Sequence, residues 1–315
     1  MQRSLLRAST PAPKKLAVIL ASLGMLTALP AAATLVEDGL SAAGMAQANG
    51  NAVQLAGPDT TLPHASAYAT DSGGGSSANG SAWGHANGPY RASADGIGAF
   101  DSTGHFIRSW EITNDSGVAQ HYAFNFFIYY GGMSTDQGFG GYGYAEYAVN
   151  ISRDNGSSTL FKSSAKIESD GTLTTGGTAL DGALLSGSSY SWDGTYVNID
   201  LGILGVGEST SIVYDLVSHA YGAYAINSDC NGYGGYGYGY GGEDIAVALA
   251  VVDNGYGGCT GSSYSSLGDP DSLNSTPIPG EGLVEIPAQI PEPATLALLG
   301  MGLAALGLRR RRQRG

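Results

Sequence analysis

Apolar and polar residues alternate along much of the chain, which predicts β-strands. The clearest run spans 119–132, where Tyr122, Phe124, Phe126 and Ile128 occupy every second position. Because successive side chains of a strand point to opposite faces, this run would bury one face and expose the other. The same period recurs in five further runs, at 105–113, 144–152, 158–169, 195–202 and 209–220. A further segment, 243–252, is apolar enough for a strand in the centre of a sheet.

Short turn signals separate these runs. Asp-Gly and Asn-Gly pairs supply the positive φ that tight hairpins need. One residue departs from the pattern, since Arg108 shares a predicted inward face with Phe106, Trp110 and Ile112. Seven or more strands without a convincing amphipathic helix predict an all-β fold, an antiparallel β-sandwich or jelly-roll-like ectodomain.

The composition divides the rest of the chain. Residues 34–95 are rich in Gly, Ala and Ser, and we expect loops there around one or two short strands such as 64–70. Residues 96–259 form the predicted β-sandwich core. Residues 260–290 are rich in Pro and Ser and predict a spacer.

Residues 1–33 have the layout of a secretory signal peptide. Four basic residues precede an apolar run at 16–29, and Ala31 and Ala33 occupy the A-x-A positions of a cleavage site. A retained membrane anchor is the alternative, but an apolar run of 14 residues is short for a span. We therefore expect export.

The segment between the two ends is strongly acidic. Residues 34–290 hold five Lys and Arg against 26 Asp and Glu, a formal net charge of −21. Such a surface repels phosphate backbones, so we expect no nucleic-acid partner. The only cysteines, Cys230 and Cys259, predict a disulfide in an exported protein, which would stabilise the fold by about 3–4 kcal/mol.

The C-terminus combines a short apolar segment with a basic cluster. Residues 294–308 would form a helix of about 22 Å, short for a hydrocarbon core of about 30 Å. By the positive-inside rule, the arginines that follow stay in the cytoplasm and the body lies outside. We therefore expect a single short C-terminal transmembrane helix. The basic cluster consists of Arg309, Arg310, Arg311 and Arg312.

Pro291, Glu292 and Pro293 directly precede this helix. Together with the Leu/Ala/Gly helix and the arginine cluster, they make residues 291–315 resemble the PEP-CTERM sorting signal of Gram-negative bacteria. The resemblance implies that an exosortase, an integral membrane enzyme, recognises and removes the tail, and that the protein belongs to a system that accompanies exopolysaccharide production. An ordinary C-terminal membrane anchor is the alternative.

The body also resembles a recurrent β-rich ectodomain that stands upstream of such tails. The similarity lies in "WEITNDSGVAQHYAFNFFIYYGG", "LFKSSAKIESDGT" and "DLGILGVGESTSIVYDLVSHA". It implies an all-β fold and no catalytic residues.

The chain lacks the usual catalytic motifs, and we expect no enzyme activity. There is no G-x-S-x-G elbow, H-E-x-x-H or P-loop, and the five histidines lack ligand spacing. A secreted glycan-active hydrolase stays an alternative, because it needs only two carboxylates that converge in space. Four acids on predicted strands are candidates, although each occupies an outward position: Glu146, Glu168, Asp200 and Asp215.

No cofactor is indicated, and calcium stays an open alternative. Acidic loops at "RDNGS", "VVDNG" and "GDPDS" offer oxygen ligands, so a Ca-dependent carbohydrate-binding module is the third hypothesis. None of these loops has the EF-hand spacing, and we interpret Asp154 and Asp253 as turn residues.

Tyrosine is the most unusual feature of the body. The chain has 19 Tyr against 3 Trp and 7 Phe, many of them in the Gly-rich stretches 138–144, 231–242 and 254–258. Tyrosines on Gly-supported loops make adaptable contact surfaces whose rings and hydroxyls suit a polysaccharide. A low-complexity, self-associating tract is the alternative.

Together these features predict an exported, exosortase-processed surface or extracellular-matrix protein. Its role would be structural, adhesive or exopolysaccharide-associated, as in a biofilm matrix. The C-terminal helix would anchor it transiently in the inner membrane before it reaches the cell surface, outer envelope or matrix.

Overall fold

The computed structural model describes residues 33–86, 88–154, 156–226, 260–268, 278 and 280–286. These residues form strands, turns and irregular segments and contain no helix, and all strand pairings are antiparallel. The all-β, antiparallel fold expected from the sequence is therefore confirmed. The strands form two seven-stranded sheets and one three-stranded sheet.

The first sheet contains the longest strands. In spatial order it consists of β11 (Leu173–Gly177), β10 (Ser158–Glu168), β9 (Gly141–Arg153), β15 (Ser209–Tyr224), β6 (Ala99–Thr113), β1 (Thr34–Ala48) and β2 (Gln54–Asp59).

The second and third sheets complete the fold. The second consists of β12 (Leu184–Ser186), β13 (Ser189–Trp192), β8 (Gly131–Asp136), β16 (Ser262–Gly268), β5 (Tyr90–Ile97), β4 (Ser76–His85) and β3 (His64–Gly73). The third consists of β14 (Thr195–Leu204), β7 (Gln120–Ile128) and β17 (Gly282–Ile286).

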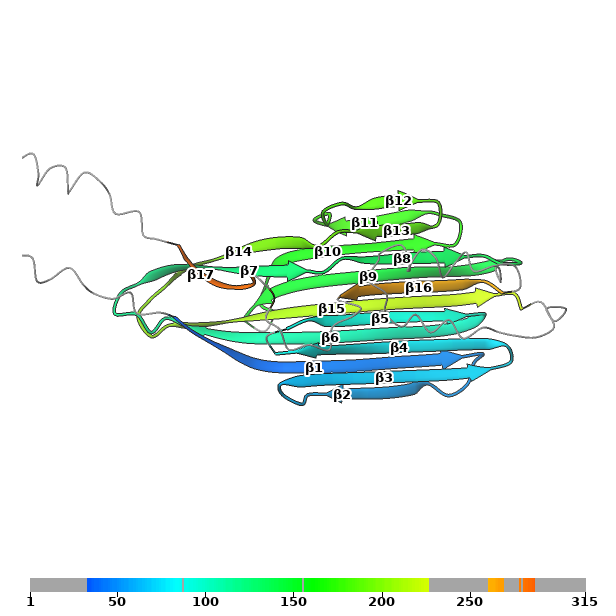
Figure 1. Ribbon diagram of the computed structural model, residues 1–315, viewed down its shortest axis with the longest axis horizontal. Coiled ribbons are helices and arrows are strands. Elements are labelled where there is room, and N and C mark those ends of the chain that lie inside the picture. Colours follow the sequence, from blue (N-terminus) through cyan, green and yellow to red (C-terminus); the bar gives the residue numbers. More distant parts are fainter. Residues whose placement is uncertain are drawn as a thin grey trace, which may run out of the picture.

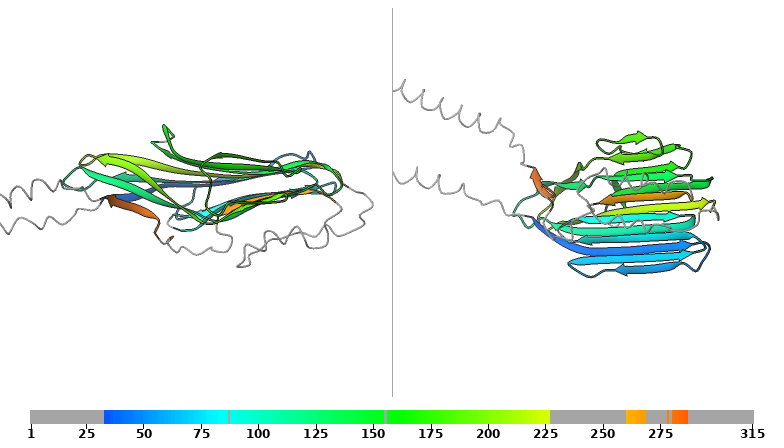
Figure 2. Two further views of the ribbon diagram at one scale, coloured as in Figure 1. Left: turned by 90° about the horizontal axis from the view of Figure 1, so that it is seen from above. Right: turned by 45° about the vertical axis from the view of Figure 1, so that its right-hand side comes forward.

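The first and second sheets lie face to face as two layers (Figures 1 and 2). The third sheet packs on the same side of the first sheet as the second sheet does, because Phe124 and Phe126 of β7 lie against Trp110 of β6 in the core shared with the second sheet. The jelly-roll-like connectivity expected from the sequence stays a prediction.

One end of this two-layered body, here called the tip, is formed by the β6–β7 loop (114–119) and the β14–β15 loop (205–208). The side-chain amide of Asn114 ties the two loops together by donating hydrogen bonds to the carbonyls of Val118 at 2.9 Å and Leu204 at 2.8 Å. The start of β1 and the end of β17 lie at this same end (Figure 1).

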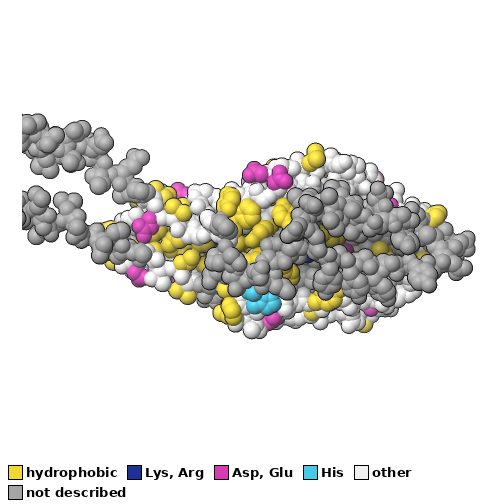
Figure 3. All heavy atoms as spheres, in the orientation of Figure 1, with side chains coloured by type: hydrophobic (Ala, Val, Ile, Leu, Met, Phe, Trp, Pro, Cys, Tyr) yellow, Lys and Arg dark blue, Asp and Glu magenta, His cyan; other side chains and the backbone are white. Residues whose placement is uncertain are grey.

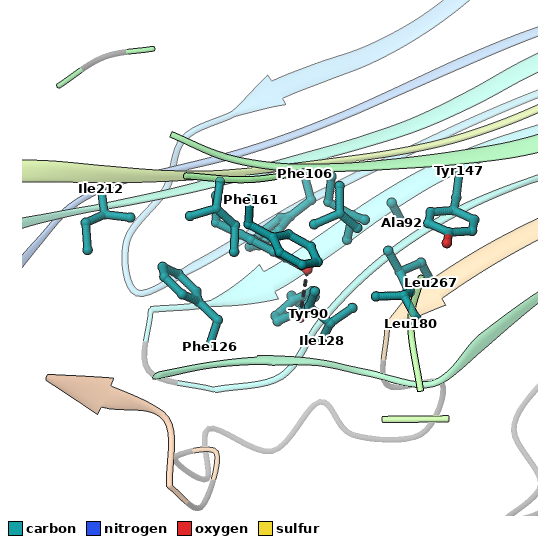
Figure 4. Close-up of a cluster of buried hydrophobic side chains, with 14 of the residues drawn as sticks. Tyr90, Ala92, Phe106, Phe126, Ile128, Tyr147, Phe161, Leu180, Ile212 and Leu267 are labelled. Atoms are coloured by element: carbon teal, nitrogen blue, oxygen red, sulfur yellow. Dashed lines mark hydrogen bonds between the residues drawn. The ribbon is translucent and has the colours of Figure 1, made fainter. Parts of the chain in front are cut away.

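An aromatic core fills the space between the layers near the tip. The Trp110 ring lies 5.1 Å from that of Phe124 and 5.4 Å from that of Phe126, between centroids. Figure 4 shows side chains from both layers converging around Tyr90. The Tyr214 hydroxyl of β15 donates a hydrogen bond of 2.8 Å to the Tyr90 hydroxyl of β5. The apolar residues that the alternating runs place inward are buried, except Val197 in the run 195–202, which is partly exposed.

Towards the opposite end, glycines let the two layers approach until their backbones touch. A Cβ on Gly44 of β1 would lie 2.3 Å from the carbonyl oxygen of Gly80 on β4. A Cβ on Gly80 would lie 2.1 Å from the carbonyl oxygen of Met45, and one on Gly104 would lie 2.1 Å from that of Ser81. Glycine is therefore required at these three inward positions.

Two predicted segment boundaries differ from the structure. Residues 34–95, expected to be mostly loops, form five strands that belong to both large sheets. Apart from Leu40 and Tyr90, the buried positions of these strands are Ala, Gly and Ser, so the alternation is real but only weakly apolar. Residues 260–290, expected to be a spacer, contain β16, which lies between β5 and β8 inside the second sheet, and β17.

Several predictions lie outside the described residues. They are residues 1–32 of the signal peptide, which include the cleavage position Ala31, the strand at 243–252, the disulfide between Cys230 and Cys259, and the C-terminal helix at 294–308. Ala33 is the first described residue and packs against the core. Within the described part of the chain, no helix has the length and apolarity needed to cross a membrane.

Candidate functional site

A group of tyrosines lies on the outward face of the first sheet, at the end opposite the tip. Tyr144 of β9 is directly opposite Tyr221 of β15, and their rings stack with centroids 5.3 Å apart and planes 22° apart. The Tyr142 ring is 6.1 Å from that of Tyr144 and 6.4 Å from that of Tyr221. We call Tyr142, Tyr144 and Tyr221 the tyrosine platform.

The alternation of glycine and tyrosine builds this platform. Tyr142 and Tyr144 occupy two outward positions of β9, whereas the inward position between them is Gly143, whose Cβ would lie 2.1 Å from the Tyr224 hydroxyl. On β15, inward Gly222 likewise makes room for the Phe100 ring, with 2.4 Å from its Cβ to the nearest ring atom. The glycines thus accommodate large inward rings from neighbouring strands, while the tyrosines remain at the surface.

A lysine braces the platform from the adjacent strand β10. The Lys166 ammonium lies 4.1 Å from the centroid of the Tyr144 ring and 3.0 Å from a Glu168 carboxylate oxygen. It also donates to the Tyr142 hydroxyl at 3.4 Å. Tyr144 is therefore held between Lys166 and Tyr221, and Tyr142, which is 43 % exposed, is the most accessible ring.

His219 lies beside the platform, between two carboxylates. Its Nδ1 is 2.8 Å from Glu146 Oε1 and its Nε2 is 2.8 Å from Asp101 Oδ1, so both nitrogens donate from a protonated ring. Burial by itself lowers the pKa of His219, but the hydrogen bonds to Asp101 and Glu146 outweigh it and raise the pKa to about 9. The hydrogen bond from His219 in turn lowers the pKa of Glu146.

This arrangement is suited to binding more than to acid–base chemistry. A general base needs a free nitrogen or carboxylate oxygen within reach of a substrate proton. Both nitrogens of His219 already bond to carboxylates, and the positive charges of His219 and Lys166 are matched by three neighbouring carboxylates. The aromatic rings and hydroxyls remain as the groups that can contact a ligand.

The four carboxylates considered for a hydrolase do not all converge, although each lies beside a basic side chain. Asp200 accepts from His121 Nε2 at 2.6 Å, and this bond lowers the pKa of Asp200. Asp215 is 2.8 Å from His105 Nε2. Glu146 and Glu168 flank the platform through their contacts with His219 and Lys166.

A small polar cavity lies under the first sheet, lined in part by Tyr147, Ser163 and Tyr190. Its volume is about 60 Å³, which is room for water and far below the roughly 300 Å³ of small-molecule sites. The Tyr147 hydroxyl is 3.1 Å from Ser163 Oγ. Burial raises the pKa of Tyr147 to about 12.

Asp154 has the turn geometry expected from the sequence. Its φ is +49°, and its carboxylate accepts from Thr210 Oγ1 at 2.9 Å. Across the described residues, no three His, Cys, Asp or Glu side chains are grouped so that they could hold a metal ion. Asp253 and the "GDPDS" loop beyond Gly268 lie outside that part of the chain.

The sequence indicated the platform only in part. The Gly-rich stretch that begins at residue 138 was expected to be a loop leading into the strand predicted at 144–152, but β9 already begins at Gly141, so Tyr142 lies on the strand together with Tyr144. Asp101, Lys166 and Tyr221 were not predicted to belong to a site. Only the strand register reveals them, because it places residues 101 and 221 opposite each other. The tyrosines of 231–242 and 254–258 lie outside the described residues.

The C-terminal segment is similar to a known sorting motif. Residues 289–312 match the PEP-CTERM protein-sorting motif. The PEP-CTERM motif covers Pro291, Glu292 and Pro293 as well as the arginines at 309–312. It indicates an exported protein that is sorted transiently through the membrane to the cell surface, with an exosortase as the processing enzyme. No curated protein and no solved structure matches the chain.

Proposed function

We propose that this chain is an exosortase-processed surface or extracellular-matrix protein that binds exopolysaccharide without catalysing a reaction. The observation that carries the proposal is the tyrosine platform. Rings of Tyr142 and Tyr221 offer apolar faces to sugar C–H groups, and their hydroxyls offer hydrogen bonds. The all-β domain provides a stiff support, because all three rings stand on paired strands of its first sheet.

The charge of the body favours a hydrated matrix in this role. Its acidic surface keeps copies apart and soluble. Around the platform, however, carboxylates are paired with His219 and Lys166, so a sugar chain meets local ion pairs instead of free negative charge. This local balance supports contact with a polysaccharide surface.

Retention on the producing cell's own polysaccharide tests the binding role. We expect Tyr142→Ser with Tyr221→Ser to weaken retention about thirtyfold, since each ring contributes roughly 1 kcal/mol of contact and the two together about 2 kcal/mol. The matched control is Tyr68→Ser, an exposed tyrosine on β3 of the other large sheet, which should bind like the unmodified protein. Equal retention of the double variant and the unmodified protein would refute the binding role of the platform.

The same assay separates the two alternatives. Release of reducing ends from the polysaccharide during incubation would favour a glycan-active hydrolase. Loss of retention with a chelator, restored by Ca²⁺, would favour a Ca-dependent carbohydrate-binding module. We expect neither result.

Sorting is tested separately in the producing cells. Deleting residues 291–315 should leave a soluble secreted form, because the segment that holds the chain in the membrane is gone. Removing the exosortase should leave a larger, uncleaved species in the membrane fraction. Unchanged processing without that enzyme would contradict exosortase sorting.

A further inference from the structure

The last strand that the structure describes ends at the tip, five residues before the sorting tail begins in the sequence at Pro291. Strand β17 pairs with β7 and runs towards the tip, so that its last residue, Ile286, is opposite His121. The Gln120 side chain donates to the Ile286 carbonyl at 3.4 Å. Thr34, the first residue of β1, donates its hydroxyl to the Asp115 carboxylate in a tip loop.

The tether between the body and the apolar tail segment is short. Eight residues lead from Ile286 to Ala294, which at about 3.5 Å per residue allow at most about 28 Å. Strand β15 alone, with 16 residues, is about 53 Å long at 3.3 Å per residue. While the tail is in a bilayer, the tip is therefore the part of the body held closest to the lipid.

Apolar side chains are exposed around this exit point. Ile203 of β14 and Ile286 of β17 flank His121 from its two sides, and directly opposed residues on neighbouring strands point to the same face. The tip loops add two more apolar residues. We call the following set the tip patch: Val118 (62 % exposed), Ile203 (70 %), Val206 (63 %), Val284 (39 %) and the half-buried Ile286.

The fold holds the tip patch outward and does not bury it. Figure 3 shows hydrophobic side chains gathered at this end of the molecule, with a few carboxylates between them. Asn114 fixes both tip loops through its hydrogen bonds, and Tyr122 donates to Asn114 Oδ1 at 2.9 Å from below. Exposed apolar residues on such a fixed surface indicate a contact site more than a packing defect.

We propose that the tip patch rests on the lipid surface of the bilayer that holds the sorting tail, so that the domain stands on the membrane at its tip before processing. This rests on the proposed membrane stage of sorting. Asp115, Glu208 and Glu285 beside the patch disfavour anionic lipid, so the fitting surface is a zwitterionic one. Removal of the tail ends this contact, because the remaining patch is too small to retain the body.

Lipid crosslinking on the full chain tests the proposal. The protein is placed in phosphatidylcholine nanodiscs at one copy per disc, with a photoreactive phosphatidylcholine, and adducts are mapped by mass spectrometry. We expect adducts in the tail and in peptides that cover 114–119, 203–206 and 284–286. Turns at the opposite end, 49–53 and 137–140, should carry few.

Paired variants sharpen the result. Val118→Asp with Val206→Asp should lower tip adducts roughly threefold or more, because a carboxylate disfavours insertion into the interface. Leu55→Asp with Leu184→Asp, two exposed leucines away from the tip, should leave them unchanged. Adducts in the tail without adducts at the tip would overturn the proposed tip contact and leave the membrane stage of sorting intact. The absence of adducts in the tail would overturn the membrane stage itself. Tip adducts that need two copies per disc would assign the patch to a second copy of the chain.

Discussion

Arg108 and Glu281 form an ion pair in the interior, with 2.7 Å between Arg108 Nη2 and Glu281 Oε1 and side chains only 1 % and 9 % exposed. The guanidinium also lies 4.3 Å from the centroid of the Trp110 ring and 5.4 Å from that of Tyr90. Burial raises the pKa of Glu281 even though Arg108 opposes this. Because Glu281 directly precedes β17, the pair fastens the last described strand to the core.

Replacing Glu281→Gln should destabilise the fold by about 3 kcal/mol, because Arg108 is left buried without a counter-charge. Urea unfolding measures the change in the free energy of unfolding. The double replacement Arg108→Met with Glu281→Leu is the control and should recover most of the loss, since an apolar pair needs no charge compensation. If the free energy of unfolding of Glu281→Gln lay within about 0.5 kcal/mol of that of the unmodified protein, the ion pair would not hold β17 to the core.

The stabilising effect of His219 should disappear at alkaline pH. Its pKa is about 9 in the folded protein and about 6.5 unfolded, so its contribution is complete below pH 6.5 and is lost as the pH rises through 9. Between pH 6 and pH 10, we expect the free-energy difference between the unmodified protein and His219→Gln to fall by about 1–2 kcal/mol, allowing for solvent screening of a partly exposed group. If the NMR signal assigned to the His219 imidazole titrated near pH 6.5, it would contradict the ion-pair arrangement.

Gly80→Ala should destabilise the fold by about 3 kcal/mol or prevent folding. The added Cβ would meet the backbone carbonyls of Met45 and Thr103 at 2.1 and 2.3 Å, and paired strands cannot shift without losing hydrogen bonds. Gly117→Ala is the matched control, because open space surrounds that position, and its unfolding midpoint should change little. Equal thermal stability of the two variants would argue against close contact between the layers.

Cys230 and Cys259 should be joined in the exported protein. Mass spectrometry without reduction should detect the linked peptides, and reduction should lower the free energy of unfolding by about 3–4 kcal/mol in the chain-entropy view. Two thiols that react with an alkylating reagent in the secreted protein would exclude the bond.

Local alternation was enough to predict much of the fold. In β7 and β9, rings and aliphatic side chains occupy every second position, and those positions are buried as expected. The same logic placed Arg108 inward without naming its partner. Alternation failed in 34–95, because Ala, Gly and Ser at inward positions give almost no hydropathy contrast, although Gly44 and Gly80 are required there by close backbone contact.

The candidate site could be predicted far less well. The abundance of tyrosine indicated a contact surface, but not that Tyr144 would stack on Tyr221 or that His219 would join Asp101 to Glu146. These neighbours are separated by long stretches of chain, and a one-residue change of register would turn each side chain to the other face.

By itself, the sequence determined the strand periods, the inward position of Arg108 and the PEP-CTERM motif, because each depends on residues that are close together in the chain. Only the tertiary structure decided which strands became neighbours. It brought Glu281 to Arg108 across 173 residues and placed the platform and the tip patch at opposite ends of the same body. The physical reason is that strand pairing and buried charge compensation are settled between distant segments, where local pattern carries no information.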